Sequence, residues 1–250
     1  MTRRSRGRWS RLAAAVAASV AAATLVACGG GDRARFGTEG AAGLWAGSTV
    51  ESSGTLDGVV LETGEYWLVF GVGGVARSLV VGSGGVSGGT FQSNNGNDYF
   101  FGQAAPFASS VAADVSPENA LRGSVYLANR LERFDMRYVP DYRFPANPNQ
   151  IIGIWRGTAT TLGTVGDIVF TVAPGGDFAA TLSGCEYSGR ITPNRNGRNV
   201  FDFTFANQPS CQFVFAASGV AVASSGRLVF TGTTPNRGDV FYAVTQASAQ

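Results

Sequence analysis

Two similar stretches open the two halves of this sequence: GLWAGS at residues 43–48 and GIWRGT at residues 153–158. In each, a tryptophan stands midway between two glycines. A weaker match aligns residues 87–100 with residues 188–201 without a gap. A repeat of about 100 residues has the length of a domain and is too long for a solenoid unit. The sequence therefore predicts two copies of one module.

Both copies carry the alternation that is typical of β-strands. Apolar and polar residues alternate over residues 133–138 in the first copy, and over 167–172, 177–183 and 200–205 in the second. Such runs between Gly, Asn and Pro clusters indicate strands with one buried face. About eight or nine short strands fit each copy, which favours an all-β fold of two small antiparallel up-and-down barrels, with β-sandwiches as the alternative.

The turns between these strands should be tight. Asn95-Gly96 and Asn196-Gly197 occupy matching positions in the weaker alignment. Both central positions of a type I′ turn need a positive φ, and this pair of residues adopts it readily. The sequence therefore predicts a two-residue hairpin turn at each site.

Proline marks the boundary between the modules. Three of the nine prolines fall within residues 140–150. Proline at this density cannot continue a strand ladder and stiffens an extended chain. We therefore place the first module at residues 43–139, a linker at residues 140–150 and the second module at residues 151–250.

The Gly-Xaa-Trp-Xaa-Gly opening resembles the first strand of lipocalin-like (calycin) barrels, in which the tryptophan closes one end of the barrel. True lipocalins also carry a Thr-Asp-Tyr motif and a C-terminal helix, which this sequence lacks, so the resemblance does not extend to lipocalin ligand binding. Five aromatic side chains are candidates for the barrel interiors: Trp45, Trp67, Trp155, Phe170 and Phe203.

The first 27 residues have the features of a secretory signal. Residues 1–11 hold five arginines and no acid, and residues 12–27 are apolar or small, a run shorter than the about 20 residues of a spanning helix. The junction LVAC at residues 25–28 resembles the lipobox of bacterial lipoproteins. This resemblance implies cleavage before Cys28 and lipidation of that cysteine.

The lipobox resemblance also bears on location. Gly29 follows the cysteine, where an aspartate typically retains lipoproteins in the inner membrane, so the resemblance implies lipid anchoring to the outer membrane of a Gram-negative bacterium, on either face. Several acyl chains together anchor a protein stably. The glycine-rich residues 28–42 predict a flexible tether. Anchor and tandem modules together resemble transferrin-binding-protein-B-like surface lipoproteins, and most of all a group of β-proteobacterial lipoproteins of unassigned function with the same repeated opening.

Composition removes several classes of chemistry. All 19 basic residues are arginine, there are 17 acidic residues, and no histidine occurs. Without histidine the chain has no Ser-His or Cys-His pair and no His metal ligand, and without lysine it has no Schiff base. Loss of the signal's arginines leaves a mildly acidic chain, which argues against binding to nucleic acid. We expect no cofactor and no metal.

Five residues of the second module are candidate sites. Cys185 and Cys211 are the cysteines that remain once Cys28 is lipidated, and an oxidising compartment predicts a disulfide between them. Arg190, Arg195 and Arg198 cluster around the predicted hairpin turn. They either contact an anionic partner, since arginine binds such groups bidentately, or form a solvated rim of charge.

These observations favour a non-catalytic envelope or surface protein that contacts a protein partner through strand edges and loops. The alternative is a carrier of a small apolar ligand inside one barrel, which needs a cavity of about 300 Å³ or more. A remote alternative is a hydrolase using Glu62 and Glu65, because a glycosidase needs two carboxyl groups about 5 to 9.5 Å apart.

Overall fold

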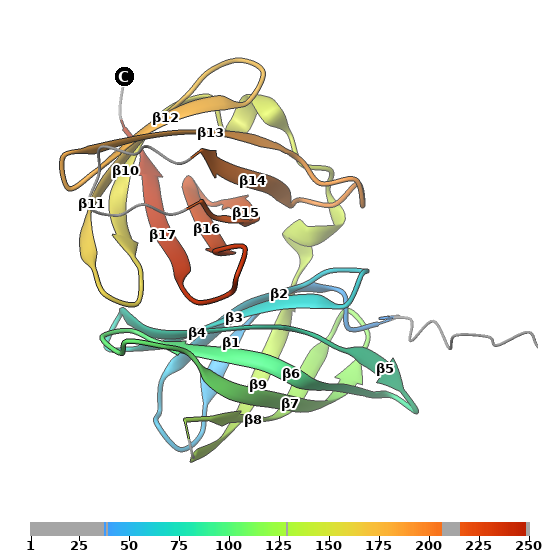
Figure 1. The fold of residues 1–250 in the computed structure, drawn as a ribbon. Helices are drawn as coiled ribbons and strands as arrows, with labels where there is room; N and C mark the ends of the chain where they lie inside the picture. The colour runs from blue at the N-terminus through green and yellow to red at the C-terminus, as the bar shows by residue number, and fades with distance from the viewer. Residues whose placement is uncertain (1–37, 39, 129, 207–215, 249–250) are drawn as a thin grey trace, which may run out of the picture. The chain divides into compact units, whose positions relative to one another are not determined.

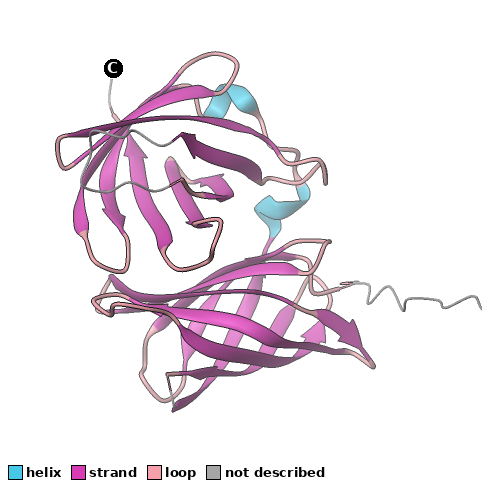
Figure 2. Ribbon diagram, in the orientation of Figure 1, coloured by secondary structure: helices cyan, strands magenta, loops and turns pink. Residues whose placement is uncertain are grey.

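The described residues are two closed eight-stranded antiparallel β-barrels in tandem (Figures 1 and 2). The computed structural model describes residue 38 and residues 40–128, 130–206 and 216–248, all within the compact unit formed by residues 36–250. The predicted fold class is confirmed, and the sandwich alternative is wrong. The predicted signal peptide, Cys28 and Cys211 lie outside the described residues.

The first barrel contains nine strands: β1 (Gly43–Thr49), β2 (Thr55–Val60), β3 (Glu65–Val72), β4 (Val75–Ser83), β5 (Gly85–Ser87), β6 (Thr90–Phe100), β7 (Phe107–Ser116), β8 (Ala120–Leu127) and β9 (Arg130–Val139). Pairing of β4 with β6 closes the barrel in the order β4-β3-β2-β1-β9-β8-β7-β6. The short strand β5 pairs with the N-terminal part of β6.

The second barrel is a plain meander of eight strands: β10 (Gly153–Thr160), β11 (Val165–Val172), β12 (Asp177–Leu182), β13 (Cys185–Pro193), β14 (Phe201–Ala206), β15 (Ser218–Ser224), β16 (Arg227–Thr233) and β17 (Val240–Ala247). Each strand pairs with the next, and β10 pairs with β17 to close the barrel.

Two short 3-10 helices occupy the predicted linker: η1 (Pro140–Arg143) and η2 (Pro148–Gln150). Each begins with proline, which suits the first helical position because its missing N–H would have no partner there. The prolines therefore start helical turns instead of stiffening an extended chain.

The repeated tryptophan makes the same hydrogen bond in both barrels. Trp45 Nε1 donates a hydrogen bond to the carbonyl oxygen of Ala41 at 2.9 Å, and Trp155 Nε1 donates to that of Ile151 at 2.8 Å. Both indoles are buried. Because a buried indole needs a partner for its single donor, the carbonyl four residues upstream fixes each ring at the start of its barrel.

The second glycine of the motif lets the barrel close. A Cβ atom on Gly47 would lie 2.0 Å from the carbonyl oxygen of Asp135 in β9, and one on Gly157 would lie 1.9 Å from that of Val244 in β17. Both distances are far below van der Waals contact. Any side chain here would push the first strand away from the last, so the motif marks the seam of each barrel.

Four of the five aromatic candidates lie inside the barrels. Trp45 belongs to the core of the first barrel, and Trp155, Phe170 and Phe203 belong to that of the second.

Trp67 does not point into the first barrel, contrary to expectation. Its neighbours in β3, Tyr66 and Leu68, belong to the barrel core, whereas Trp67 belongs to a separate apolar cluster. Successive residues of a strand face opposite sides of the sheet, so Trp67 faces outward.

The first barrel includes residues that were expected to belong to the flexible tether. Ala41 is fully buried in the core of the first barrel, and Thr38 is buried with its hydroxyl donating to the carbonyl oxygen of Glu62 at 2.8 Å. These two residues therefore belong to the barrel and not to a flexible segment.

The two predicted hairpin turns are not formed as expected. Asn95 and Gly96 lie inside β6, where the register with β7 shifts between Ser93 and Gly96. The one extra residue on β6 forms a bulge instead of a turn. In the second barrel residues 194–200 form a longer loop, in which Gly197 has a φ of +72°.

Candidate functional site

The interior of the second barrel is filled. Its cavity measures about 10 Å³ and is lined by five residues: Ile168, Leu182, Tyr187, Phe205 and Phe241. Aromatic rings pack closely around it, with Phe170 and Phe230 stacked at 4.4 Å between ring centroids. A small-molecule site needs about 300 Å³ or more, so this barrel offers no room for a carried ligand within its described residues.

Large side chains also occupy the interior of the first barrel. Its core includes Trp45, Tyr66, Phe91 and Phe134, all nearly inaccessible to solvent. Tyr66 and Phe91 meet edge to face at 5.7 Å. Eight-stranded barrels of this size are usually filled by their own side chains. Neither core therefore supports the carrier alternative.

One end of the first barrel interior is polar, which the sequence analysis missed. Asp98 and Glu132 are each 1% exposed. Glu132 accepts from the backbone N–H of Ser52 at 2.7 Å and lies 3.8 Å from Arg130 Nε. Asp98 Oδ1 has no hydrogen-bond partner within the described part of the chain. Burial raises the pKa of Asp98 to about 6, while a hydrogen bond from Ser78 opposes the rise.

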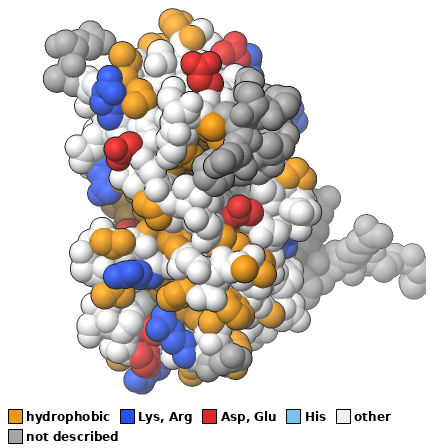
Figure 3. Space-filling view, turned by 60° about the vertical axis from the view of Figure 1, so that its left-hand side comes forward, with side chains coloured by type: hydrophobic (Ala, Val, Ile, Leu, Met, Phe, Trp, Pro, Cys, Tyr) orange, Lys and Arg blue, Asp and Glu red, His pale blue; other side chains and the backbone are white. Residues whose placement is uncertain are grey.

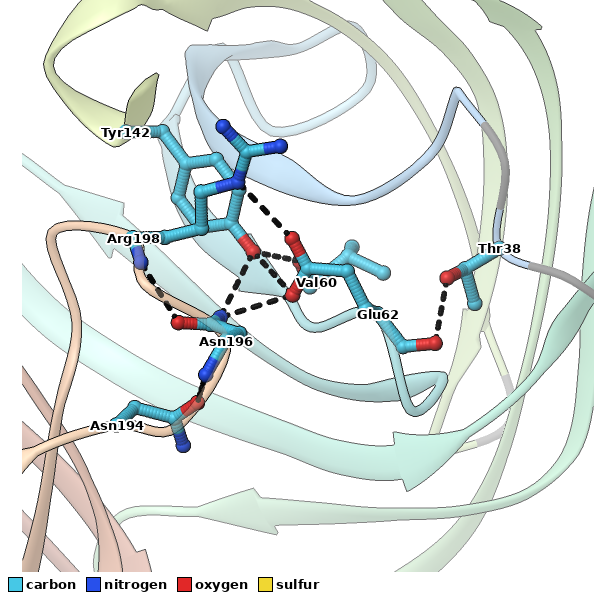
Figure 4. Close-up of polar contacts among 7 residues, drawn as sticks. All are labelled: Thr38, Val60, Glu62, Tyr142, Asn194, Asn196 and Arg198. Carbon is cyan, nitrogen blue, oxygen red and sulfur yellow. Dashed lines mark hydrogen bonds and ion pairs between the residues drawn. The ribbon is translucent and has the colours of Figure 1, made fainter. Parts of the chain in front are cut away.

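Glu62 is the centre of a polar network between the first barrel, the linker and the second barrel (Figure 4). Its carboxylate accepts from the Tyr142 hydroxyl at 2.9 Å, from Asn196 Nδ2 at 2.8 Å and from Arg198 Nε at 3.4 Å. Burial, and then the nearby negative charge of Glu62, raises the pKa of the Tyr142 hydroxyl. This tyrosine therefore stays protonated and donates to the carboxylate.

This network joins two residues that the sequence analysis assigned to different roles. Glu62 was a candidate carboxylate of a hydrolase, and Arg198 a candidate contact for an anion. Each is instead a partner of the other. Glu65 starts β3, where its carboxylate accepts from the Thr63 hydroxyl at 3.3 Å.

The other two candidate arginines differ in their surroundings. Arg190 lies on β13 and pairs with Asp177 at 2.8 Å. Arg195 is exposed in the loop of residues 194–200. Two of the three arginines therefore have carboxylate partners within the chain, which leaves Arg195 as the candidate for an external anion.

Apolar side chains from both barrels pack together outside the barrel cores. The cluster combines Trp67, Leu79 and Val81 of the first barrel with Val220 and Val240 of the second. These contacts explain why an outward-facing tryptophan is buried.

Two hydrogen bonds add to these contacts. The Tyr99 hydroxyl donates to the carbonyl oxygen of Arg237 at 2.9 Å, and Arg237 Nη2 donates to that of Val81 at 2.9 Å.

A groove of about 840 Å³ lies on the first barrel, and we call it the polar groove. It runs from the β4–β5 connection across β6, β7 and β8 to the start of β9, strands that Figure 1 labels. The residues that matter for its chemistry are Gln92, Asn94, Asn95, Ser110, Ser124 and Tyr126. The groove could not be expected from the sequence, because Asn95-Gly96 is equally typical of a hairpin turn.

The bulge in β6 shapes this groove. Asn95 Oδ1 accepts from the backbone N–H of Ser83, and its Nδ2 donates to the Ser83 hydroxyl, both at 2.9 Å. Asn95 thus holds the end of β4 against the bulge. Gln92 and Asn94 are exposed on the same strand, and their side-chain amides have no partner within the described chain.

Tyr126 forms the floor of the groove on β8. It is 44% exposed and lies in register between Ser110 of β7 and Leu131 of β9. Its ring contacts no other aromatic ring among the described residues. Because 44% of Tyr126 is exposed, part of its side chain is open to a ligand.

Two ion pairs lie on the strands beside the polar groove. Arg122 lies 2.9 Å from Asp135, and Arg133 lies 2.6 Å from Glu51. The hydrogen bond from Arg133 lowers the pKa of Glu51. On the face drawn in Figure 3, acidic and basic side chains are likewise interspersed.

Two further observations concern the described residues as a whole, and one concerns Cys185. The described residues contain no group of three or more His, Cys, Asp or Glu side chains able to hold a metal ion, and no helix there is long and apolar enough to cross a bilayer. Cys185 begins β13 and packs against the second core. Its pairing with Cys211 remains a prediction.

Comparisons with known proteins add little. No family model matches the chain, and no curated protein sequence is similar to it. Among solved structures, a DUF3598-family protein of unknown function from Nostoc punctiforme matches with a TM-score of 0.29 and 11% identity, over 86% of this chain and 100% of that chain. A proposed outer membrane protein from Bacteroides fragilis matches with a TM-score of 0.26 and 10% identity, over 82% of this chain and 95% of that chain.

Proposed function

We propose that the protein is a non-catalytic lipoprotein, anchored to the outer membrane through Cys28, that holds a partner on the outside of its barrels. The lipobox supports the anchor, and the filled barrel interiors support recognition at the outer surface. The second observation carries the proposal, because the cavity in the described core of the second barrel measures about 10 Å³ and has no room for cargo.

Non-catalytic function is supported by the side chains available. The chain has no histidine or lysine. Its one candidate carboxylate with several polar neighbours, Glu62, accepts three hydrogen bonds from side chains of the protein itself. A carboxylate that accepts three hydrogen bonds from the protein stabilises the contacts between the elements that supply the donors.

Titration with a fluorescent fatty-acid analogue tests the outer-surface mode of binding. We expect no saturable signal from the full-length protein. Stoichiometric binding that is lost when Phe241 or Phe205 is changed to a charged residue, with the fold retained by circular dichroism, would show that the barrel carries apolar cargo.

Metabolic labelling tests the anchor. Cells expressing the full chain and fed an alkyne analogue of palmitate should label the protein, and Cys28→Ser should abolish the label. Sedimentation of membranes on a density gradient should place the labelled protein in the outer-membrane fraction. Persistent labelling of Cys28→Ser, or recovery of the protein in the inner-membrane fraction, contradicts this part of the proposal.

A further inference from the structure

We infer that the polar groove on the first barrel binds an uncharged carbohydrate chain. This inference rests on the proposed function, since it names the class of partner that the outer surface holds. It is carried by the juxtaposition of unpaired amides, hydroxyls and one partly exposed tyrosine in a groove of about 840 Å³.

The lining has the hydrogen-bonding character of a sugar site. The amide side chains of Gln92 and Asn94 are exposed and lack partners within the described chain. Each amide offers both a donor and an acceptor, which matches the paired hydroxyls of a sugar ring. The hydroxyls of Ser110 and Ser124 extend this polar surface across two neighbouring strands.

The aromatic residue supplies the apolar contact that a sugar ring also needs. Tyr126 is 44% exposed and lines the groove, with Ser110 in register on β7, Leu131 in register on β9, and Ser124 two residues before it on β8. Its ring face is therefore accessible from the groove. A tyrosine combines a flat apolar face with a polar hydroxyl, so it can pack on the C–H face of a ring while bonding its hydroxyls.

The lining of the polar groove contains no charged side chain, which favours an uncharged ligand. None of the residues that line the polar groove is charged, and nearby Arg122 and Arg133 are paired with Asp135 and Glu51. A site for phosphate, uronate or nucleic acid would present arginines to those groups.

A protein partner fits this surface less well than a glycan does. Stable protein interfaces have an apolar centre built from several large side chains. Within the polar groove only Tyr126 and Leu131 are both large and exposed. The groove volume of about 840 Å³ instead falls in the range of small-molecule sites, roughly 300 to 1,000 Å³.

Isothermal titration of the full-length protein with neutral hexasaccharides tests the inference. The probes are maltohexaose, cellohexaose and chitohexaose, with an oligogalacturonate of equal length as the acidic comparison. We expect at least one neutral probe to bind and the acidic probe to bind at least about tenfold more weakly. Neutral binding should change little with salt, because no charge is neutralised.

Variants test whether the saccharide binds in the polar groove. Tyr126→Ala and Asn94→Ala should each weaken the neutral probe by about tenfold or more, an effect of about 1.4 kcal/mol. Tyr126→Phe should retain most of the affinity, because the ring face remains. Phe144→Ala is the matched control, since Phe144 is an exposed aromatic residue, 64% accessible, that does not line the polar groove.

Three results would overturn the inference: no binding of any neutral probe, equal binding of the acidic probe, or binding that Tyr126→Ala and Asn94→Ala leave unchanged. In each of these cases the proposed function still stands, because it requires only an outer surface. Saturable binding of the fatty-acid analogue inside a barrel defeats the proposed function itself.

Discussion

Asp98 is the residue whose burial has the clearest energetic consequence. It lies 1% exposed at the polar end of the first barrel interior, near Arg130, Glu132 and Ser78. Its pKa is raised by burial from 3.8 to about 6. The protonated form is therefore the better tolerated one in the folded state.

This shift predicts a dependence of stability on pH. Because the folded-state pKa lies above the unfolded one, the stabilising contribution is fully present below about pH 4 and is lost as the pH rises through about 6, with a total of about 3 kcal/mol. Asp98→Asn should remove this dependence. The variant should be more stable than the wild type at pH 7.5, and the difference should shrink toward pH 4, as measured by urea unfolding.

The outcome that contradicts this prediction is equally specific. If Asp98→Asn destabilises the protein more at pH 7.5 than at pH 4, the wild-type carboxylate is ionised and well paired in the folded state. The prediction that burial raises the pKa of Asp98 would then be wrong.

The aromatic residues show what the sequence could and could not predict at this scale. Trp45 and Trp155 were predictable as barrel plugs, because the motif repeats with its flanking glycines. The outward direction of Trp67 was not predictable, because every residue of β3 from Tyr66 to Phe70 is apolar. A strand that is buried on both faces is apolar throughout, so its sequence does not show which residues face the barrel core.

The first strand of each barrel is the element that sets the fold. Its second glycine lies against the backbone of the last strand, so any side chain forces the seam apart. Gly157→Ala would place a Cβ atom 1.9 Å from the carbonyl oxygen of Val244. We expect it to destabilise the protein by about 3 kcal/mol through overpacking, measured as a lower midpoint of thermal unfolding.

A matched control separates the seam from a general effect of removing glycine. Gly163 has no atom within 4 Å of a built Cβ and lies in the β10–β11 connection. Gly163→Ala should leave the midpoint nearly unchanged. Equal midpoints for the two variants would show that the glycine is not needed for closure.

Strand β13 carries one end of the predicted disulfide. Cys185 opens this strand, and Cys211 follows β14 in the sequence. A disulfide closing a loop of this length should stabilise the second barrel by roughly 3 to 4 kcal/mol. Alkylation of the unfolded protein without reductant, followed by intact-mass analysis, should modify neither cysteine. Modification of both residues would disprove the link.

The loops explain the main errors at the scale of elements. Asn-Gly was read as a hairpin signal in both modules, yet Asn95-Gly96 forms a bulge inside β6. An Asn-Gly pair is compatible with either a hairpin turn or a bulge. The pairing of β6 with β4, β5 and β7 decides which of the two forms. Since those pairings join residues distant in the sequence, the bulge and the polar groove beside it could not be predicted from the dipeptide.

At the scale of the whole molecule, contacts between the barrels should make unfolding cooperative. Trp67 is 7% exposed within the apolar cluster shared by both barrels. Trp67→Ala should cost about 3 to 5 kcal/mol, the range for a buried large aromatic residue. By calorimetry we expect one transition in the wild type and two in the variant, because each barrel keeps its own core.

Phe144→Ala again serves as the control, because this aromatic residue is largely exposed. It should leave a single transition at the wild-type temperature. A single, unshifted transition in Trp67→Ala would show that the barrels do not stabilise each other.

The two-module organisation was predictable because the repeat, the strand periodicity and the prolines all agree. The surface that recognises a partner was not, because it combines single residues of β6, β7 and β8 that are separated along the chain. No sequence motif contains Gln92, Ser110 and Tyr126 together. Only strand pairing brings them into one groove.

The central claim is that recognition takes place outside the barrels, which amide chemical-shift mapping of the full-length protein tests most directly. Titration with the neutral hexasaccharides should shift the amides of residues 92–95, 110–112 and 124–126, and titration with palmitate should shift none of the core. Saturable shifts at core residues such as Phe170 and Phe241 on addition of palmitate, with the groove amides unmoved by any saccharide, would contradict it.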